Sequence, residues 1–317
     1  MTADLVPTRD VRRENLTGTL FAGLGRGPHP GVLVVHGSGG GGGYERRYAR
    51  RLAHHGYTAF CVEYFDAPGR PDALDRIPLS YFGRAVEWLL GQSETDGQRV
   101  GAVGFSRGGE AAMLTGAHFE GVGAVVAYSA SGYAFPAPTW MPGVEVEGPA
   151  WTRDGDPVPY LPVDELVEEE QDGFEDVVEN EDVDASTSAV ANATDEQRRR
   201  ATIPVERIDG PVLLVSGGED AIWPSADLSR VATDRLDASD HSWRYDLLVH
   251  PDAGHAIRTP YRSGGGSAPE EASAAGPDPD ADHRLGGTRR ANARAAAEAW
   301  RVALDYLRRG LRSDEES

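Results

Sequence analysis

The chain has 317 residues, of which 39% are hydrophobic and 26% are charged, so it can bury a sizeable core without disulfide bonds. Its apolar runs are too short to span a membrane, and residues 1–13 lack the apolar segment of a signal peptide, so we expect a cytoplasmic protein. Cys61 is the only cysteine, which excludes an intramolecular disulfide and any cysteine-based zinc or iron–sulfur site.

The charge of the chain is strongly negative. It has 51 acidic residues against 31 basic ones, all of them arginine, for a net charge of −20. Such a surface repels phosphates, so we expect neither nucleic acid nor an anionic membrane as a partner. The acidic residues are spread along the whole chain, which favours adaptation to high salt over a local acidic interaction surface. The charge therefore indicates habitat and says little about substrate.

Strand and helix patterns alternate along most of the chain. Short apolar runs of β-branched residues, typical of strands buried on both faces, alternate with amphipathic stretches. This order predicts an α/β fold with a mostly parallel sheet and helices on both faces. The expected strands are 31–36, 57–64, 100–103, 122–128, 211–215 and 245–249, and the expected helices are 45–55, 78–92, 110–117, 225–235 and 291–311.

One domain over residues 31–311 accounts for this alternation. Residues 1–30 are interpreted as an extended lead-in and residues 312–317 as a tail. Two stretches interrupt the pattern, a proline-marked and then acidic insertion at about 135–200 and a low-complexity loop at about 262–283. Insertions of this length in a compact domain are typical of lids or disordered loops.

The segment Gly104-Phe105-Ser106-Arg107-Gly108 matches the pattern G-x-S-x-G and occurs once. It lies between an apolar strand and a helical stretch, where a sharp turn would present Ser106 at the carboxyl edge of the sheet. A serine in an ordinary glycine loop is the alternative in a chain with 39 glycines. The position between strand and helix favours a nucleophile.

A serine nucleophile needs a base, and the base needs an orienting acid. Asp220 follows the strand at 211–215 and is the expected acid, with its neighbour Glu219 as the competitor. His255 follows the last strand and is the expected base, because it lies at the same sheet edge. The other histidines considered are expected to be structural, namely His250 at a strand end, His54 and His55 at a helix end and His36 before a glycine loop.

An oxyanion hole requires two backbone N–H groups that face the developing charge. One is expected from Arg107, directly after the nucleophile, and the other from Ser38 or Gly39 in the glycine loop after the first core strand. A phosphate-binding or dinucleotide loop is the alternative for this glycine run. A Walker loop needs a lysine that the chain lacks, whereas Glu63 stands near the place of a dinucleotide-loop acid. The downstream Ser, Asp and His favour the hydrolase interpretation.

Two acidic stretches carry little signal. Residues 277–282 match a fragment of a calcium loop without the rest of its pattern, and residues 168–184 form an acidic run. Both are interpreted as solvated loops. We therefore expect no metal and no organic cofactor.

With these residues in place, the sequence resembles the catalytic domain of the acyl-CoA thioesterases and bile acid-CoA:amino acid N-acyltransferases, α/β-hydrolases related to dienelactone hydrolases. The resemblance runs in order over residues 31–311 and implies Ser106, Asp220 and His255 as the triad. In this family the amino-acid-conjugating members resemble a cysteine version, so Ser106 favours hydrolysis over transfer to an amine. The similar segments are 31–43, 78–82, 87–90, 104–110, 203–208, 218–225, 254–257, 260–261, 286–287 and the helix through Trp300.

The sequence thus predicts a serine hydrolase that cleaves acyl thioesters, above all acyl-CoA, through an acyl-enzyme intermediate. A carboxylesterase or dienelactone hydrolase-like enzyme acting on oxygen esters is the second interpretation. It is favoured by the short stretch ahead of residue 31, because family members carry a β-sandwich domain there. A non-catalytic α/β-hydrolase scaffold that binds a ligand is the third. Arg107, Arg258 and Arg262 are the arginines expected near the site that are available to neutralise CoA phosphates in an acidic protein.

Overall fold

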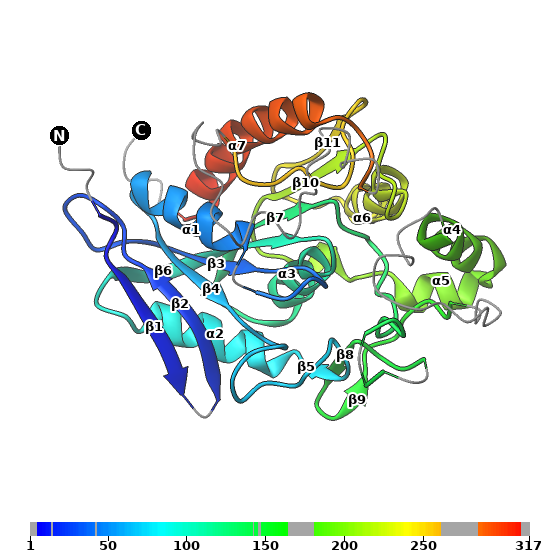
Figure 1. Cartoon of the computed structure of the whole chain (residues 1–317), viewed down its shortest axis with the longest axis horizontal. Coiled ribbons are helices and arrows are strands. Elements are labelled where there is room, and N and C mark those ends of the chain that lie inside the picture. Colours follow the sequence, from blue (N-terminus) through cyan, green and yellow to red (C-terminus); the bar gives the residue numbers. More distant parts are fainter. Residues whose placement is uncertain are drawn as a thin grey trace, which may run out of the picture.

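The structure is a computed structural model that describes residues 5–163 except 14, 42, 142, 145 and 146, together with residues 181–260 and 285–311. Its centre is an eight-stranded sheet in the order β1-β2-β4-β3-β6-β7-β10-β11, flanked by helices (Figure 1). This confirms the predicted α/β class with a mostly parallel sheet. The expected features at 168–180, 262–283 and 312–317 lie outside the described residues.

The parallel part of the sheet comprises six strands. Their registers are parallel throughout, and most of the residues in its four inner strands are buried. Burial on both faces explains why these runs are continuously apolar instead of alternating. The strands are β3 (His29–Val35), β4 (Thr58–Val62), β6 (Thr95–Phe105), β7 (Val122–Tyr128), β10 (Val212–Gly217) and β11 (Tyr245–His250).

The stretch before residue 31 adds two strands to the same sheet. β1 (Thr8–Arg13) and β2 (Leu16–Phe21) form an antiparallel hairpin, and β2 pairs antiparallel with β4. These residues were expected to form a lead-in ahead of the domain, whereas all six residues of β2 are buried in it. Their charged first half, without a long apolar run, hid the strands from a pattern search.

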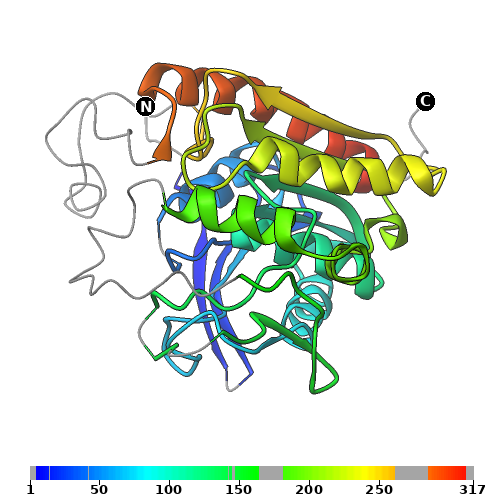
Figure 2. The same ribbon diagram turned by 90° about the vertical axis from the view of Figure 1, so that its right-hand side faces the viewer.

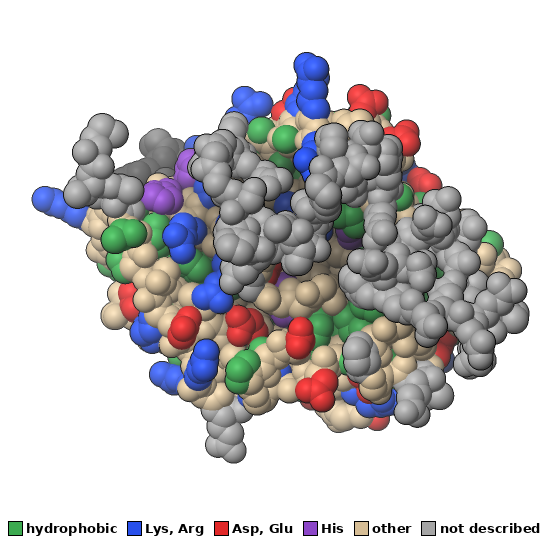
Figure 3. Space-filling view, in the orientation of Figure 1, with side chains coloured by type: hydrophobic (Ala, Val, Ile, Leu, Met, Phe, Trp, Pro, Cys, Tyr) green, Lys and Arg blue, Asp and Glu red, His purple; other side chains and the backbone are tan. Residues whose placement is uncertain are grey.

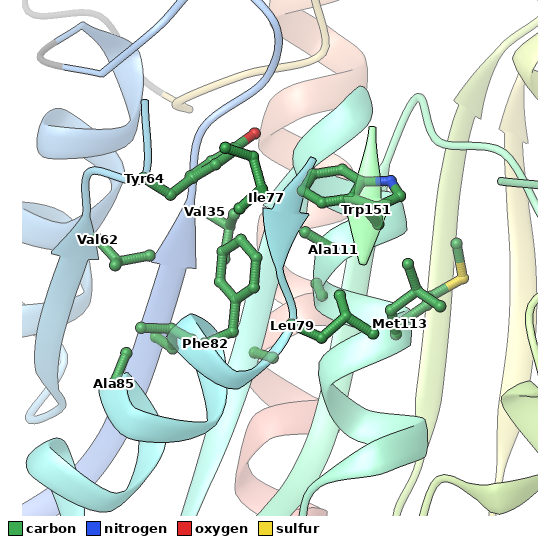
Figure 4. Close-up of a cluster of buried hydrophobic side chains, with 14 of the residues drawn as sticks. Val35, Val62, Tyr64, Ile77, Leu79, Phe82, Ala85, Ala111, Met113 and Trp151 are labelled. Carbon is green, nitrogen blue, oxygen red and sulfur yellow. The ribbon is translucent and has the colours of Figure 1, made fainter. Parts of the chain in front are cut away.

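Helices cover both faces of the sheet. α1 (Tyr44–His54) and α7 (Arg289–Leu311) pack on one face with Val32, Val34 and other alternate strand residues. The opposite face carries α2, α3 and α6, whose apolar residues pack around the other strand positions. Figure 4 shows Phe82 of α2 and Met113 of α3 in this layer. These helices span α2 (Ser80–Leu90), α3 (Arg107–His118) and α6 (Ser225–Ala238).

A close backbone approach lets α7 lie against the sheet. A Cβ atom at Gly310 would lie 1.9 Å from the carbonyl oxygen of Gly123 in β7, and one at Gly123 would lie 2.4 Å from that of Gly310. No side chain fits between the two backbones at these distances. The apolar residues of α7, Trp300 and Leu307 among them, are therefore buried against the strands.

The insertion at 135–200 contains ordered structure beside α6 (Figure 2). Apolar residues of α4, α5 and the loop after β7 form a third cluster with Trp223 and Leu228. Thr194 caps α5, because its hydroxyl accepts the N–H of Gln197 while the Gln197 side chain accepts that of Thr194. The elements are β8 (Trp151–Arg153), β9 (Asp156–Pro157), α4 (Glu181–Asn192), α5 (Asp195–Ala201) and the 3-10 turn η1 (Val205–Arg207), and β5 (Ile77–Pro78) completes a small sheet with β8 and β9.

Charges of both signs are interspersed on the face seen in Figure 3, with small apolar areas between them. Within the described ranges, every helix is too short or too polar to cross a bilayer.

Candidate active site

Ser106 stands at the turn between β6 and α3. Its backbone has φ of +53° and ψ of −125°, a region that non-glycine residues rarely adopt. Two hydrogen bonds hold this conformation: the N–H of Ser106 donates to the carbonyl of Tyr128 at 2.8 Å, and the N–H of Gly109 donates to the carbonyl of Ser106 at 2.8 Å. This geometry is that of a nucleophile elbow, in which the serine projects from the carboxyl edge of the sheet.

The glycines on either side of Ser106 allow this turn. A Cβ at Gly104 would lie 2.0 Å from the carbonyl oxygen of Gly108, and a Cβ at Gly108 would lie 2.2 Å from that of His36. Both positions require the absence of a side chain. The loop after β3 is close as well, because a Cβ at Gly37 would lie 3.2 Å from Cβ of Ser106. The pattern G-x-S-x-G therefore reflects a backbone contact between the end of β3 and the start of α3.

Asp220 and His255 are joined directly. Nδ1 of His255 lies 2.9 Å from Oδ2 and 3.1 Å from Oδ1 of Asp220, whose side chain is 1% exposed. Oδ1 of Asp220 also accepts the N–H of Ile222 at 3.0 Å, which fixes the carboxylate. Because an ionised carboxylate only accepts hydrogen bonds, this contact favours the His255 tautomer with its proton on Nδ1, which leaves the Nε2 lone pair free. Glu219, the competing acid, is exposed.

Ser106 and His255 both contact the carboxyl end of β7. The N–H of Ser106 donates to the carbonyl of Tyr128, and the hydroxyl of the next residue, Ser129, donates to the carbonyl of His255 at 3.1 Å. The two described side chains of Ser106 and His255 share no hydrogen bond. The structure thus joins Asp220 to His255 and presents Ser106 beside them on the same edge.

The expected oxyanion donors lie around the same turn. Arg107 is the first residue of α3, and its N–H belongs to the group of helix-start donors that have no partner within the helix. Ser38 and Gly39 form the tip of the turn that the bond from Gly40 N–H to the Gly37 carbonyl closes at 3.3 Å. The N–H groups of Arg107, Ser38 and Gly39 meet no acceptor among the described residues. A positive helix end also favours negative charge here.

The Arg107 side chain points into the protein and not toward a substrate. Its Nη2 donates to the carbonyls of Phe135 at 2.7 Å and Pro136 at 2.8 Å, and its Nε lies 3.4 Å from Oε1 of Glu110. The residue is 7% exposed. The expectation that Arg107 is available to neutralise CoA phosphates is therefore wrong, because its guanidinium anchors the loop after β7.

Glu110 is the buried partner of this arginine. Its Oε2 accepts the indole N–H of Trp151 at 2.9 Å, and burial raises its pKa to about 7 despite the attraction of Arg107. No role was predicted for Glu110 from the sequence, although a glutamate three residues after Arg107 on a predicted helix has the spacing of an ion pair.

Three further residues adjoin the site without having been predicted there. The Trp223 indole donates to the carbonyl of Ser129 at 2.9 Å, and its ring centroid lies 6.2 Å from that of His255. The Tyr44 ring carries the Arg258 guanidinium 4.4 Å from its centroid, and burial raises the pKa of Tyr44 to about 12. Ser129 directly follows an expected strand, and that position was the available signal.

His36 and His250 are two of the histidines that were expected to be structural. His36 is buried, stacks on Tyr64 at 4.2 Å between ring centroids and bonds the Gly37 carbonyl through Nδ1, and burial lowers its pKa to about 4. It is neutral at pH 7 and stands behind the glycine loop. His250 lies 3.7 Å from Glu298, and burial lowers its pKa. Arg262 and the stretch 277–282 lie outside the described residues.

Comparison with solved structures shows the fold. A putative dienelactone hydrolase from Klebsiella pneumoniae superposes with a TM-score of 0.56 at 18% identity and covers 96% of this chain and 99% of its own. A puromycin-hydrolysing peptidase from Mycobacterium tuberculosis has a TM-score of 0.54 at 13% identity and covers 100% of this chain and 41% of its own.

Sequence comparison with curated proteins finds acyl-coenzyme A thioesterases. Acyl-coenzyme A thioesterase 5 of Mus musculus is 28% identical over 96% of this chain and 66% of its own length. The peroxisomal succinyl-coenzyme A thioesterase of the same organism is 28% identical over 79% of this chain and 54% of its own length. The chain therefore spans between about half and two thirds of the length of these relatives.

A family match covers most of the site. It extends over residues 77–313, well over half of the chain, and includes Ser106, Asp220 and His255. The family is described as BAAT / acyl-CoA thioester hydrolase C terminal. With the α/β-hydrolase fold and this match, the chain belongs to the BAAT / acyl-CoA thioester hydrolase C-terminal family.

Proposed function

We propose that this protein hydrolyses acyl thioesters, with acyl-CoA as the substrate class and Ser106, His255 and Asp220 as its catalytic triad. The observation that carries the proposal is the Asp220–His255 hydrogen bond of 2.9 Å at the sheet edge where Ser106 occupies its strained turn. Family membership and the thioesterase names of the relatives support the choice of thioester.

The reaction follows from the roles of these groups. Ser106 Oγ attacks the acyl carbonyl carbon while Nε2 of His255 takes the hydroxyl proton, and Asp220 stabilises the imidazolium. The N–H groups of Arg107 and of Ser38 or Gly39 bind the oxyanion. The carbon–sulfur bond then breaks, and the leaving thiolate takes the proton from His255. Water attacks the acyl-enzyme in the same way, which releases the carboxylic acid and regenerates Ser106.

Arg258 is the cation available to an anionic part of the substrate. It follows His255 by three residues and lies on the Tyr44 ring, and it has no acidic partner within the described part of the chain. Arginine binds phosphate and carboxylate through paired N–H groups. We assign it to a negative group of the substrate, either a CoA phosphate or a carboxylate on the acyl chain.

The decisive experiment measures thiol release from a panel of acyl-CoAs beside release of p-nitrophenol from p-nitrophenyl esters, for wild type and Ser106→Ala. Release of CoA that requires Ser106 supports a thioesterase. Ester cleavage without CoA release instead supports the second candidate, a carboxylesterase, which the fold shared with dienelactone hydrolases favours. Intact far-ultraviolet circular dichroism of Ser106→Ala is the folding control.

A fluorophosphonate probe separates both enzymes from a non-catalytic scaffold. Labelling of wild type that is absent in Ser106→Ala indicates an activated serine. A folded wild type that neither labels nor turns over any substrate contradicts the enzymatic proposal.

The net charge of −20 underlies a second part of the proposal, a cytoplasm of high salt as the working environment. Activity and melting temperature should rise together as KCl increases from millimolar to molar concentration. A decrease in both contradicts this habitat and leaves the assignment of the site unaffected.

A further inference from the structure

A cavity lies at the end of α3 remote from Ser106. Its volume is about 530 Å³, a size typical of small-molecule sites. Its walls come from the C-terminal half of α3, the β8–β9 hairpin, α5, η1 and α6. The twelve residues of α3 separate the two places by roughly 18 Å along the helix axis.

Arginines are concentrated around this cavity in an otherwise acidic protein. Two of the five are committed elsewhere, since Arg199 pairs with Glu196 and Arg235 pairs with Glu206. The other three come from three different elements and are the following: Arg153 of β8, Arg200 of α5 and Arg207 of η1.

These three arginines have only long ion pairs, or none, with the described residues. Arg153 lies 3.6 Å from the exposed Asp154, and Arg207 lies 4.0 Å from Glu206, which already bonds Arg235. Arg200 makes no ion pair with any described residue. Asp154 and Asp156 are the carboxylates that also line the cavity, so the arginines outnumber them. Each of the three guanidinium groups therefore retains N–H donors for an anion.

His118 lies in the positive potential of these arginines. Its imidazole lines the cavity at the end of α3 and has no hydrogen-bond partner among the described residues. Burial lowers its pKa, and Arg153 and Arg207 lower it further, while Asp154 acts in the opposite direction. A neutral imidazole between two cations is an additional donor or acceptor for a bound anion.

Part of the remaining wall is apolar. Leu114, Val158 and Ile203 line it together with the prolines of the β8–β9 hairpin and of the turn before η1. A small inorganic anion would leave this surface exposed, whereas a flat organic group attached to phosphate would cover it. The combination of separated arginines and an apolar wall matches an organic phosphate of nucleotide size.

We propose that this cavity binds a phosphorylated nucleotide, with Arg153, Arg200 and Arg207 on its phosphates and the apolar wall on its base. The site is separate from the sheet edge that carries Ser106, and the inference does not depend on the proposed hydrolysis. A free nucleotide and the nucleotide portion of CoA share the required chemistry, so the experiment includes both.

The test is isothermal titration calorimetry of the full chain with ADP, CoA and inorganic phosphate, with Ser106→Ala as a second protein for CoA. ADP should bind, and inorganic phosphate should bind far more weakly because it misses the apolar wall. Arg153→Ala, Arg200→Ala and Arg207→Ala should each weaken ADP binding by roughly tenfold, which is ~1.4 kcal/mol. The matched control is Arg26→Ala, which removes an exposed arginine on the loop between β2 and β3 and should leave the affinity unchanged.

The CoA arm identifies the source of the nucleotide. Competition between CoA and ADP, lost in Arg200→Ala, assigns the site to CoA as well as to free nucleotide. ADP binding that CoA does not displace restricts the site to free nucleotides. Absence of binding of both ligands at millimolar concentration to a folded protein overturns the proposal, as does binding that the three arginine variants leave unchanged.

A spectroscopic readout guards against variants that disturb the fold. Bound phosphate offsets the two arginines that depress the pKa of His118, so the pKa of this histidine should rise when wild type binds ADP. Its titration is followed by nuclear magnetic resonance with and without ADP. Binding without any change at His118 places the nucleotide elsewhere and overturns the assignment.

Discussion

The two ends of helix α3 are constructed on different principles. At its start, backbone contacts hold Ser106 in a strained conformation, and glycines make these contacts possible. At its other end, arginine side chains from separate elements surround a cavity near His118. A site that must place one oxygen atom accurately uses rigid backbone, whereas a site that attracts charge can use long side chains. Substitutions should therefore have large effects at the start of α3 and small ones at its end.

The largest expected effect concerns the partner of His255. Asp220→Asn keeps the size of the side chain but offers an amide in place of a carboxylate, so it no longer holds the proton of His255 on Nδ1. We expect turnover to fall about 10⁴-fold with folding intact. The matched control is Glu219→Gln, which changes the adjacent exposed acid and should leave turnover within about twofold. Similar losses in both variants would contradict the choice of Asp220.

The next effect tests the backbone contact at the elbow. Gly108→Ala would place a Cβ atom 2.2 Å from the carbonyl oxygen of His36, so β3 or α3 must move. We expect the free energy of unfolding to drop by about 3 kcal/mol or more, measured by urea denaturation. Gly91→Ala is the control, because its nearest neighbours would lie 3.5 Å away. Equal stability of the two variants would show that the elbow yields easily.

The buried pair behind the elbow should give a pH signature. The pKa of Glu110, raised to about 7 by burial, lies above its ordinary value of 4.5, so the native protein binds more protons than the unfolded chain between these values. Its contribution to stability is present below pH 4.5 and is lost as the pH rises through 7. We expect the Glu110 contribution to fall by up to about 1.4 kcal/mol per pH unit in this window.

Glu110→Gln removes this titration. The difference in unfolding free energy between wild type and Glu110→Gln, measured from pH 4.5 to 8, isolates Glu110 because the other groups contribute to both proteins. A difference that stays constant with pH would mean that the pKa of Glu110 in the folded protein is ordinary.

The smallest expected effects are changes in stability that compare the two ends of α3. Ser106→Gly relieves the unfavourable φ of +53° and should stabilise the protein by about 1 kcal/mol relative to Ser106→Ala, although both lack the nucleophile. Arg200→Ala at the other end should change stability by less than about 0.5 kcal/mol. Thermal denaturation measures both. A Ser106→Gly variant less stable than Ser106→Ala would indicate that the turn stores no strain.

Much of the parallel sheet was accessible from the sequence, because residues buried on both faces of a strand leave continuous apolar runs. The hairpin of β1 and β2 was not, since the first of these strands exposes most of its charged residues to water. The short elements of the insertion were equally hidden, because two- and three-residue strands have no detectable period.

The roles of individual side chains divide in the same way. The sequence by itself determined the strand–turn–helix around Ser106, since glycines at 104 and 108 between an apolar strand and a helix leave few other conformations. It also placed candidate acids and a histidine at strand ends. Only the tertiary structure brought the Asp220 carboxylate to His255, turned Arg107 inward to Phe135 and Pro136, and gathered Arg153, Arg200 and Arg207 around one cavity. The physical reason is that local backbone geometry is encoded by neighbours in the chain, whereas burial and charge partners come from residues far apart in it.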